Sequence, residues 1–334
     1  MSFETMQPNG SNARTIVDII TLLVVVNMLK VHLDTDLGSN SDDLCALAML
    51  LKWPNVQITG ITTNTEKEAK RAGYTKYALQ VAGIEDIPVK AGSDITSGYY
   101  RGQPGLPNES EYWPEAILSS PNPLDEALEL LKASIEQDAI VIGIGSFTNF
   151  CLLDQKYPGI LKKAKLFLMG GYIYPVREGY PQRDNDTDWN IQVDVNSAKY
   201  VLENSNPTLI PLSITVETAI RRAYLPKLSQ AGKLGEIMAT QAAALNKEYD
   251  NEGKFGKTCS GLPNDILNFQ HDALACAIAL GWNDGVEVKE VPLRFEIKET
   301  YLHEIPDENG KPTRVVTKVN GDKFNELWLS TVTS

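Results

Sequence analysis

Short apolar runs alternate with amphipathic stretches along most of this 334-residue chain. The apolar runs are continuous and rich in β-branched residues, as at 56–62 and 139–144. The stretches between them space their apolar residues as one face of a helix does. Continuous apolar strands that alternate with helices are typical of a mainly parallel sheet covered on both faces. The pattern therefore predicts a single α/β domain with a mainly parallel central sheet flanked by helices.

The predicted elements follow one another in a regular order. We expect strands at 29–33, 56–62, 89–91, 139–144, 164–169 and 208–214, and helices at 42–51, 66–81, 124–136, 196–203, 233–247 and 271–280. Beyond residue 286 the chain has strand character again, followed by a C-terminal helix near 324–330. Two stretches, 96–113 and 172–189, are rich in loop residues, and long loops in a compact α/β domain are often functional.

The first 27 residues do not fit this alternation. A polar stretch is followed by an apolar run that is too short to span a bilayer and is interrupted by Asp18. A signal peptide is one interpretation, but Arg14 is the only basic residue before the run and no A-x-A site follows it. We therefore interpret 1–27 as a disordered or dispensable extension and 28–334 as the domain that carries the function. A chain that starts at Met28 should fold and be active, and an insoluble product would contradict this.

Composition narrows the class of partner. The net charge is −12 at pH 7, which argues against binding to the anionic backbone of a nucleic acid. We expect no membrane partner, because the one long apolar run is too short to span a bilayer. Four cysteines are scattered along the chain without a C-x-x-C pair, at Cys45, Cys151, Cys259 and Cys276. This spacing favours reduced core residues of a cytoplasmic protein over a disulfide framework.

The strongest chemical signal is a cluster of four aspartates in V-H-L-D-T-D-L-G-S-N-S-D-D-L. Asp34 and Asp36 end the first predicted strand, and Asp42 and Asp43 open the helix that follows. Four carboxylates at one strand end repel one another, and a hard cation held by oxygen ligands is the simplest compensation. The carboxyl end of a strand in an α/β sheet is also where ligand sites are built. The cluster therefore predicts a cation site.

Two other interpretations of the cluster stay open. A helix cap at Ser41, with the second pair of carboxylates near the positive end of the helix dipole, leaves the first pair unexplained. An apolar strand that ends in D-x-D also begins the haloacid-dehalogenase-type magnesium phosphatases, in which the first aspartate is a nucleophile. The Leu37-Gly38 pair that follows here fits that pattern poorly.

Four further motifs come later in the chain. The glycines of I-G-I-G-S-F-T-N lack the third glycine of a dinucleotide fingerprint, but such a turn can expose a backbone carbonyl to a cation. L-M-G-G-Y ends another apolar strand. D-W-N, at 188–190, places an acid, an aromatic ring and an amide together. Q-H-D-A begins a helix with His271, a candidate general acid, and Asp272, a candidate metal ligand.

In this order and spacing the motifs resemble those of the calcium-dependent nucleoside hydrolases, the inosine–uridine preferring N-ribohydrolase family. The resemblance covers the chain from about residue 28 to the C-terminus. It implies a single α/β domain with a Rossmann-like core, assembled as a homodimer or homotetramer. It also implies calcium-dependent hydrolysis of the N-glycosidic bond of ribonucleosides to ribose and a free base, a reaction of nucleoside catabolism and of purine or pyrimidine salvage.

The resemblance further implies a role for each matched residue. Asp36 matches the general base, which also touches the calcium ion (Ca2+), and His271 matches a candidate acid for the leaving group. The other metal ligands would be Asp43, Asp272 and the backbone carbonyl of Ile144. The ribose would be held by Asp42, Asn64, Asn185, Asp188 and Asn190, with Asp34 supporting the site.

The chain departs from the family pattern at several positions. The first loop is two residues longer than the commonest form, and Asn40 stands where longer variants have a third aspartate. Asp188 replaces a longer glutamate, which shortens its reach to the ribose. Tyr249 lies in a segment that could line the base pocket. These departures keep open a catalytically weak protein that binds a ribosyl ligand through calcium.

Overall fold

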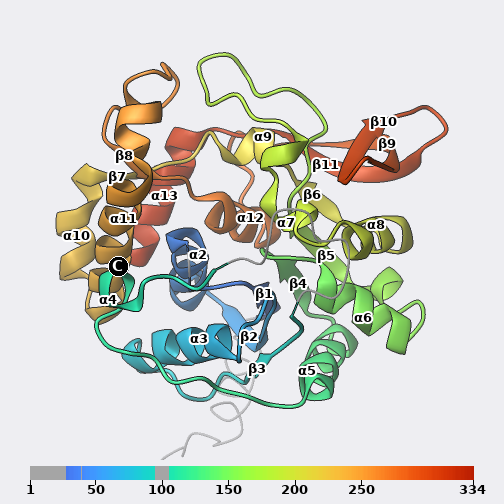
Figure 1. The fold of residues 1–334 in the computed structure, drawn as a ribbon, viewed down its shortest axis with the longest axis horizontal. Coiled ribbons are helices and arrows are strands. Elements are labelled where there is room, and N and C mark those ends of the chain that lie inside the picture. Colours follow the sequence, from blue (N-terminus) through green and yellow to red (C-terminus); the bar gives the residue numbers. More distant parts are fainter. Residues whose placement is uncertain (1–27, 39, 95–104) are drawn as a thin grey trace, which may run out of the picture.

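The computed structural model describes residues 28–38, 40–94 and 105–334. The expectations for residues 1–27, and for part of the loop-rich stretch 96–113, lie outside these residues. Within them the chain forms an α/β domain in which helices cover both faces of a central sheet (Figure 1). The predicted fold class is confirmed.

The central sheet is mainly parallel. The strands are β1 (Leu29–Thr35), β2 (Val56–Thr63), β3 (Val89–Ala91), β4 (Ile140–Gly143), β5 (Lys165–Met169), β6 (Thr208–Ile210), β7 (Ile220–Arg221), β8 (Ile266–Asn268), β9 (Glu287–Lys298), β10 (Tyr301–Pro306) and β11 (Lys311–Lys318). In the described part of the chain, nine of them form one sheet in the order β10-β9-β11-β6-β5-β4-β1-β2-β3. The strands from β11 to β3 pair in parallel, and β9 is antiparallel to both of its neighbours. β7 and β8 form a separate antiparallel pair.

The helices divide into two layers, each with its own apolar core. The α-helices are α2 (Ser41–Lys52), α3 (Lys70–Val81), α4 (Glu109–Tyr112), α5 (Leu124–Glu136), α6 (Thr148–Lys156), α7 (Trp189–Gln192), α8 (Val195–Asn204), α9 (Leu212–Thr215), α10 (Leu225–Gln230), α11 (Lys233–Tyr249), α12 (His271–Ala279) and α13 (Gly321–Val332). Short 3₁₀ turns are η1 (Leu161–Lys163), η2 (Asn185–Thr187) and η3 (Arg222–Tyr224), and η4 (Glu252–Gly256) is a π-helix. One core cluster joins the sheet to α2, α3, α11, α12 and α13, and the other joins it to α5, α6 and α8.

The start of one helix and the end of one strand differ from the boundaries that the sequence pattern predicts. Asn40, rather than Ser41, occupies the N-cap position of α2, and its side chain makes no capping hydrogen bond. The strand predicted at 208–214 ends at Ile210, and the short helix α9 follows. Pro211 explains this second difference, because it has no backbone N–H to give to a neighbouring strand.

The start of α3 also differs from the prediction. The helix begins at Lys70 instead of residue 66, since Thr65, Glu68 and Ala69 have positive φ angles of 46°, 53° and 56°. The Glu66 side chain accepts hydrogen bonds from backbone N–H groups in the first turn of α3. A side-chain cap thus replaces the extra helical turn that the sequence pattern predicts.

The described residues contain no helix that is both long and apolar enough to cross a membrane. Cys45, Cys151 and Cys276 are buried and Cys259 is partly exposed, all as free thiols. The carboxyl ends of β1, β2, β4 and β5 meet at one edge of the sheet because these strands are parallel. That edge carries three of the sequence motifs, at the ends of β1, β4 and β5.

Candidate active site

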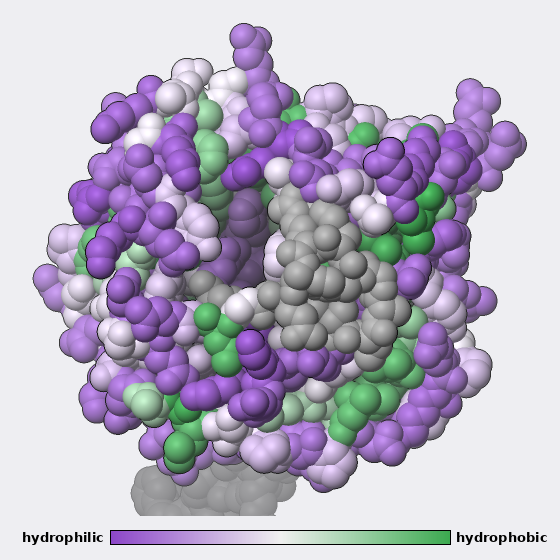
Figure 2. Space-filling view, viewed as in Figure 1, coloured by the Kyte–Doolittle hydropathy of each residue, from purple (hydrophilic) through white to green (hydrophobic). Residues whose placement is uncertain are grey.

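A cavity of about 870 Å³ lies at this edge of the sheet. Figure 2 shows the hollow in the surface, with hydrophilic residues at its bottom. Most of the predicted site residues line it: Asp36, Asp42, Asp43, Ile144, Asp188, Asn190, His271 and Asp272. Three predicted residues, Asp34, Asn64 and Asn185, are not part of its lining.

Three buried carboxylates meet at the acidic end of this cavity. Asp42, Asp43 and Asp272 each offer an oxygen, and these oxygens lie within 4.8 Å of one another. Burial raises the pKa of Asp42 to about 7, with a further contribution from Asp36. The pKa values of Asp43 and Asp272 are also raised, first by burial and then by the neighbouring carboxylates. The ionised forms of these three carboxylates are therefore unfavourable unless a positive charge compensates them.

A divalent cation fits this group of residues. Asp42 Oδ1 is buried and has no hydrogen-bond partner among the described residues. A buried oxygen without a partner costs about 1–3 kcal/mol, which a bound cation or a ligand hydroxyl would relieve. Carboxylate and carbonyl oxygens are the ligands that hard cations prefer. The residues present are therefore suited to hold a metal ion of that kind.

Asp36 faces the same cavity from the end of β1. Its backbone carbonyl accepts a hydrogen bond from the buried guanidinium of Arg71. Arg71 also donates through Nε to the carbonyl of Thr65, at 2.9 Å. Burial raises the pKa of Asp36, and the charge of Arg71 partly opposes that rise. A raised pKa suits a carboxylate that must accept a proton during a reaction.

Asp34 lies behind the cavity wall, in a network of buried hydrogen bonds. Thr62 Oγ1, Asn64 Nδ2 and Asn149 Nδ2 donate to it at 2.5, 2.6 and 2.7 Å. Burial raises the pKa of Asp34 to about 7. Asn64 Oδ1 in turn accepts the backbone N–H of Ser146 at 2.9 Å. Asn64, predicted to contact ribose, has both ends of its amide engaged in this network.

Asn190 links two strand ends at the cavity. Its side-chain Nδ2 donates to the carbonyl oxygens of Ile144 and Met169, at 3.1 Å each. The backbone N–H of Ile144 donates to the carbonyl of Asp34 at 2.9 Å, which fixes the turn after β4. The carbonyl of Ile144, the predicted metal ligand, is thus held at the cavity by contacts on both sides.

Asp188 stands at the N-terminus of α7, where its carboxylate accepts the backbone N–H of Gly171. Gly171 has a φ of 102°, a conformation that favours glycine. Burial raises the pKa of Asp188 to about 6. Asp188 is shorter than the glutamate of the family pattern, and the backbone N–H of Gly171 holds its carboxylate in place.

Behind Asp188 lies a second buried carboxylate, which sequence reasoning missed. Glu304 Oε2 accepts the backbone N–H of Tyr172 at 3.0 Å, and Oε1 has no partner among the residues that the structure describes. Burial raises the pKa of Glu304 to about 8, with a further contribution from Asp188. Asn185 points toward this pair, at 3.4 Å from both Glu304 Oε2 and the Leu302 carbonyl, rather than into the cavity.

His271 lines the cavity next to Asp272 and contacts Thr215 and Phe269. Its Nδ1 lies 2.7 Å from Thr215 Oγ1, and its ring stacks on Phe269 with 5.3 Å between the ring centroids. Burial lowers the pKa of His271 to about 3, and the charge of Arg183 contributes. The imidazole is therefore neutral at pH 7, so it serves better as a hydrogen-bond donor than as a cationic acid.

The far end of the cavity includes Arg183, which no motif predicted, whereas Trp189 belongs to D-W-N and Tyr249 to the segment expected to line the base pocket. Arg183, Trp189 and Phe269 line it, together with Tyr249, which is 49 % exposed. Asn268, next to Phe269, donates to Asn40 Oδ1 at 2.8 Å. The longer first loop is thereby tied to β8. The two ends of the cavity are joined by this contact and by His271.

Fold and site together define an α/β enzyme with an acidic, cation-accepting cavity at the carboxyl edge of its sheet. The model of the family described as inosine-uridine preferring nucleoside hydrolase matches residues 31–326. The chain therefore belongs to the nucleoside hydrolase family and is an N-glycosyl hydrolase. The resemblance predicted from the motifs is confirmed.

The chain is also similar to individual proteins and to solved structures. An uncharacterized protein of Schizosaccharomyces pombe is 28% identical over 244 residues, which cover 67% of this chain and 76% of that protein. The pyrimidine-specific ribonucleoside hydrolase RihB of Escherichia coli is 22% identical, over 88% of this chain and 94% of its own. A purine-preferring ribonucleoside hydrolase from Gardnerella vaginalis shares the fold, with a TM-score of 0.73 at 19% identity over 91% of this chain and 98% of its own.

Proposed function

We propose that this protein hydrolyses the N-glycosidic bond of ribonucleosides in a calcium-dependent reaction, giving ribose and a free base. The observation that carries the proposal is the meeting of Asp42, Asp43 and Asp272 in one cavity with Asp36. These residues come from the end of β1, the start of α2 and the start of α12, and an orphaned carboxylate oxygen lies among them.

In this proposal the calcium is held by Asp36, Asp43, Asp272 and the carbonyl of Ile144. Oxygen ligands of this kind suit calcium, which accepts flexible coordination by carboxylates, carbonyls and water. When bound, the ion lowers the pKa of a water molecule and anchors the vicinal hydroxyls of the sugar. The cavity lining supports this set, because all four residues belong to it.

The residues of the chain have separate roles in the proposed reaction. Asp36 takes the proton of the attacking water, and its raised pKa suits that task. Asp42, Asp188 and Asn190 hold ribose hydroxyls along the wall between the two ends of the cavity. Positive charge develops on the sugar as the bond breaks, and the surrounding carboxylates stabilise it. His271 donates a hydrogen bond to the departing base.

Asn64 and Asn185 receive positioning roles in this scheme. Asn64 holds Asp34 and the turn at Ser146, and Asn185 contacts the Glu304 carboxylate behind Asp188. Both act on the ribose through another residue. The catalytic unit that we propose is 28–334, since the family match begins at residue 31 and β1 begins at Leu29. Assembly as a homodimer or homotetramer and a cytoplasmic location stay predictions.

A panel of ribonucleosides assayed with and without calcium tests the function. Reducing sugar should be released from inosine, uridine or a related riboside, lost on chelation and restored by calcium. A 2′-deoxynucleoside should react far more slowly, because it lacks one of the two hydroxyls. Phosphate release from phosphoesters with magnesium would favour the phosphatase alternative instead. Calcium-dependent ribose binding without turnover on the whole panel would favour the catalytically weak alternative.

A further inference from the structure

A row of rings with a cation beside it forms the far end of the cavity. Phe255 and Phe269 pack edge to face with their centroids 5.5 Å apart, and Phe269 stacks on His271 at 5.3 Å. The guanidinium carbon of Arg183 lies 5.0 Å from the centroid of Phe255 and 6.0 Å from that of Phe269. Arg183, Phe269 and His271 line the cavity itself. We call this group the cationic end.

Arg183 differs from the other arginines nearby. Arg177, Arg221 and Arg222 form ion pairs with Glu217, Asp265 and Glu252. Among the described residues, no carboxylate forms an ion pair with Arg183 and no side chain or backbone group hydrogen-bonds to it. A guanidinium stays protonated in proteins and carries five N–H donors. With its face near two aromatic rings, its donors remain for a ligand in the cavity.

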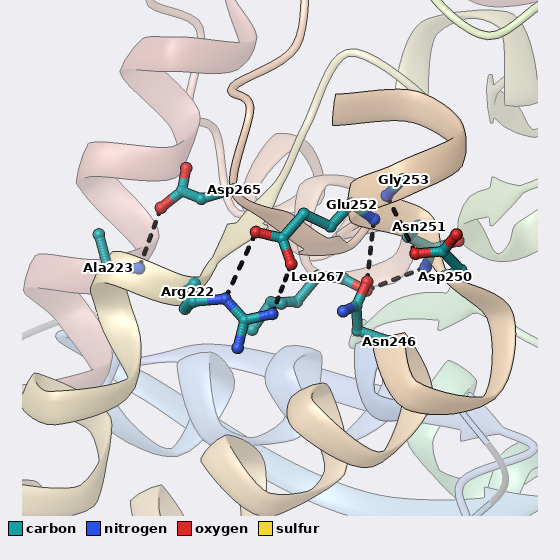
Figure 3. A network of polar contacts seen from close by, with 9 residues as sticks. All are labelled: Arg222, Ala223, Asn246, Asp250, Asn251, Glu252, Gly253, Asp265 and Leu267. Carbon is teal, nitrogen blue, oxygen red and sulfur yellow. Dashed lines mark hydrogen bonds and ion pairs between the residues drawn. The ribbon is translucent and has the colours of Figure 1, made fainter. Parts of the chain in front are cut away.

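The segment that carries Phe255 is tied to the rest of the molecule at its start, where Figure 3 draws Asn246, Asn251 and Glu252. Phe255 belongs to η4, and the residues that lead into this π-helix are fixed on two sides. Asn251 Nδ2 donates to the carbonyl of Leu267 at 2.9 Å, and the backbone N–H of Glu252 donates to Asn246 Oδ1 at 2.9 Å. Figure 3 also shows the ion pair between Glu252 and Arg222. The rings that receive the guanidinium are therefore preorganised.

The charges of the two ends match the charges that bond cleavage creates. His271 immediately precedes Asp272 of the carboxylate group, and its ring stacks on Phe269, whose centroid lies 6.0 Å from the guanidinium carbon of Arg183. When a C1′–N bond breaks, its electron pair leaves with the base nitrogen, and the sugar becomes positive. A cation that lines the same cavity beside Phe269 can stabilise the negative charge that develops on the base.

We propose that Arg183 determines the specificity for the leaving base and favours ribosides whose base carries, or easily accepts, a negative charge. This inference rests on the proposed function. In the reaction, the water oxygen bonds to C1′, one water proton passes to Asp36, and the electron pair of the C1′–N bond stays on the base. Arg183 holds the resulting anion by charge-assisted hydrogen bonds until the base takes a proton from solvent.

Steady-state kinetics of Arg183→Gln with calcium present test the inference. The probes are xanthosine, whose base is acidic near neutral pH, and adenosine and cytidine, whose bases are not. Loss of a charge-assisted contact should lower kcat/KM for xanthosine by ~30-fold, against less than about 3-fold for the other two. Arg183→Lys should recover part of the difference, because it restores the charge but not the planar donors. Inhibition by free ribose should be unchanged in both variants.

Arg177→Gln is the matched control. Arg177 lies in the same long loop and over the ring of Tyr180, but it is paired with Glu217 and does not line the cavity. It should leave the xanthosine-to-cytidine ratio as in the wild type. Circular dichroism and thermal unfolding should show that Arg183→Gln is folded, and its activity on cytidine gives a second check.

Three outcomes overturn the inference. An equal loss of kcat/KM on every riboside would make Arg183 a general structural residue. Unchanged kcat/KM values on all three ribosides would remove it from specificity altogether. A preference for nucleoside 5′-phosphates that disappears in Arg183→Gln would place the bound anion on the sugar instead of the base. If the wild type hydrolyses no riboside at all, the proposed function fails first, and the two failures are thereby distinguished.

Discussion

The acidic end and the cationic end of the cavity are built in different ways. The acidic end grows from the termini of buried parallel strands, and hydrogen bonds from Thr62, Asn64 and Asn149 hold the carboxylate behind it. The cationic end combines a long loop, a π-helix and the junction of β8 with α12, through ring stacking and a guanidinium. Its residues come from loops and element ends instead of buried strand termini.

This difference separates two tasks that one enzyme must perform. Recognition of ribose and activation of water need exact geometry, which rigid strand ends supply. Recognition of the base can be adjusted in loops, which tolerate change because little of the core depends on them. A mutation at the cationic end should therefore alter the choice of substrate, whereas one at the acidic end should abolish the reaction or destabilise the fold.

The largest expected effect comes from Asp36→Asn, which separates chemistry from base binding. Without the proton acceptor kcat should fall by ~10³-fold, within the usual range for general base catalysis. Inhibition by the free base should persist, because the cationic end is untouched. Initial rates of reducing-sugar release and product inhibition measure the two effects. Asp86→Asn, exposed in the turn after α3, is the control, and full activity of Asp36→Asn would refute the assigned base.

Asn64→Ala tests whether the acidic end depends on its buried support. The change leaves Asp34 Oδ1 and the backbone N–H of Ser146 without a partner that they now have. The free energy of unfolding should fall by ~2–3 kcal/mol, measured by urea denaturation. Asn185→Ala removes only long contacts of 3.4 Å at a partly exposed site and should cost less than about 0.5 kcal/mol. A raised KM with unchanged stability in Asn64→Ala would instead indicate direct contact with ribose.

The smallest effect is expected from Glu304→Gln, which changes the buried carboxylate behind Asp188. The native pKa of Glu304 is raised to about 8 from 4.5, so the folded state holds a proton that the unfolded state releases in this window. Wild-type stability should therefore fall by ~2 kcal/mol relative to the glutamine variant for a rise of about 1.5 pH units within this window. Unfolding by urea across a pH series measures the difference. Glu308→Gln, exposed after β10, should follow the wild type, and parallel curves for Glu304→Gln and wild type would contradict the prediction.

The sequence predicted the acidic end because its members share short motifs. Asp36, Asp42 and Asp43 lie within one strand–loop–helix unit, and the parallel sheet brings the other strand ends to the same edge. The alternation of apolar runs and helices was sufficient for the fold class. It failed locally at Pro211, where the strand stops, and at the start of α3, where positive φ angles break the helix.

The cationic end could not be predicted in the same way. Arg183 lies in a loop without periodicity, and Phe255 lies in a π-helix, a rare element that no apolar pattern identifies. Glu304 alternates along the strand β10 like an ordinary residue, and only its burial beside Asp188 gives it a role. Such residues acquire their meaning from tertiary contacts, which a sequence read in windows does not contain.

The position of α12 late in the chain also has a consequence for synthesis. The ribosome makes β1 and α2 early, so a nascent chain carries Asp36, Asp42 and Asp43 long before Asp272 exists. The edge of the sheet is likewise incomplete until β11 inserts between β6 and β9. Domains generally fold as units during synthesis, and this one can complete its active site only when almost the whole polypeptide has emerged. Premature termination before α12 therefore yields no partially active fragment.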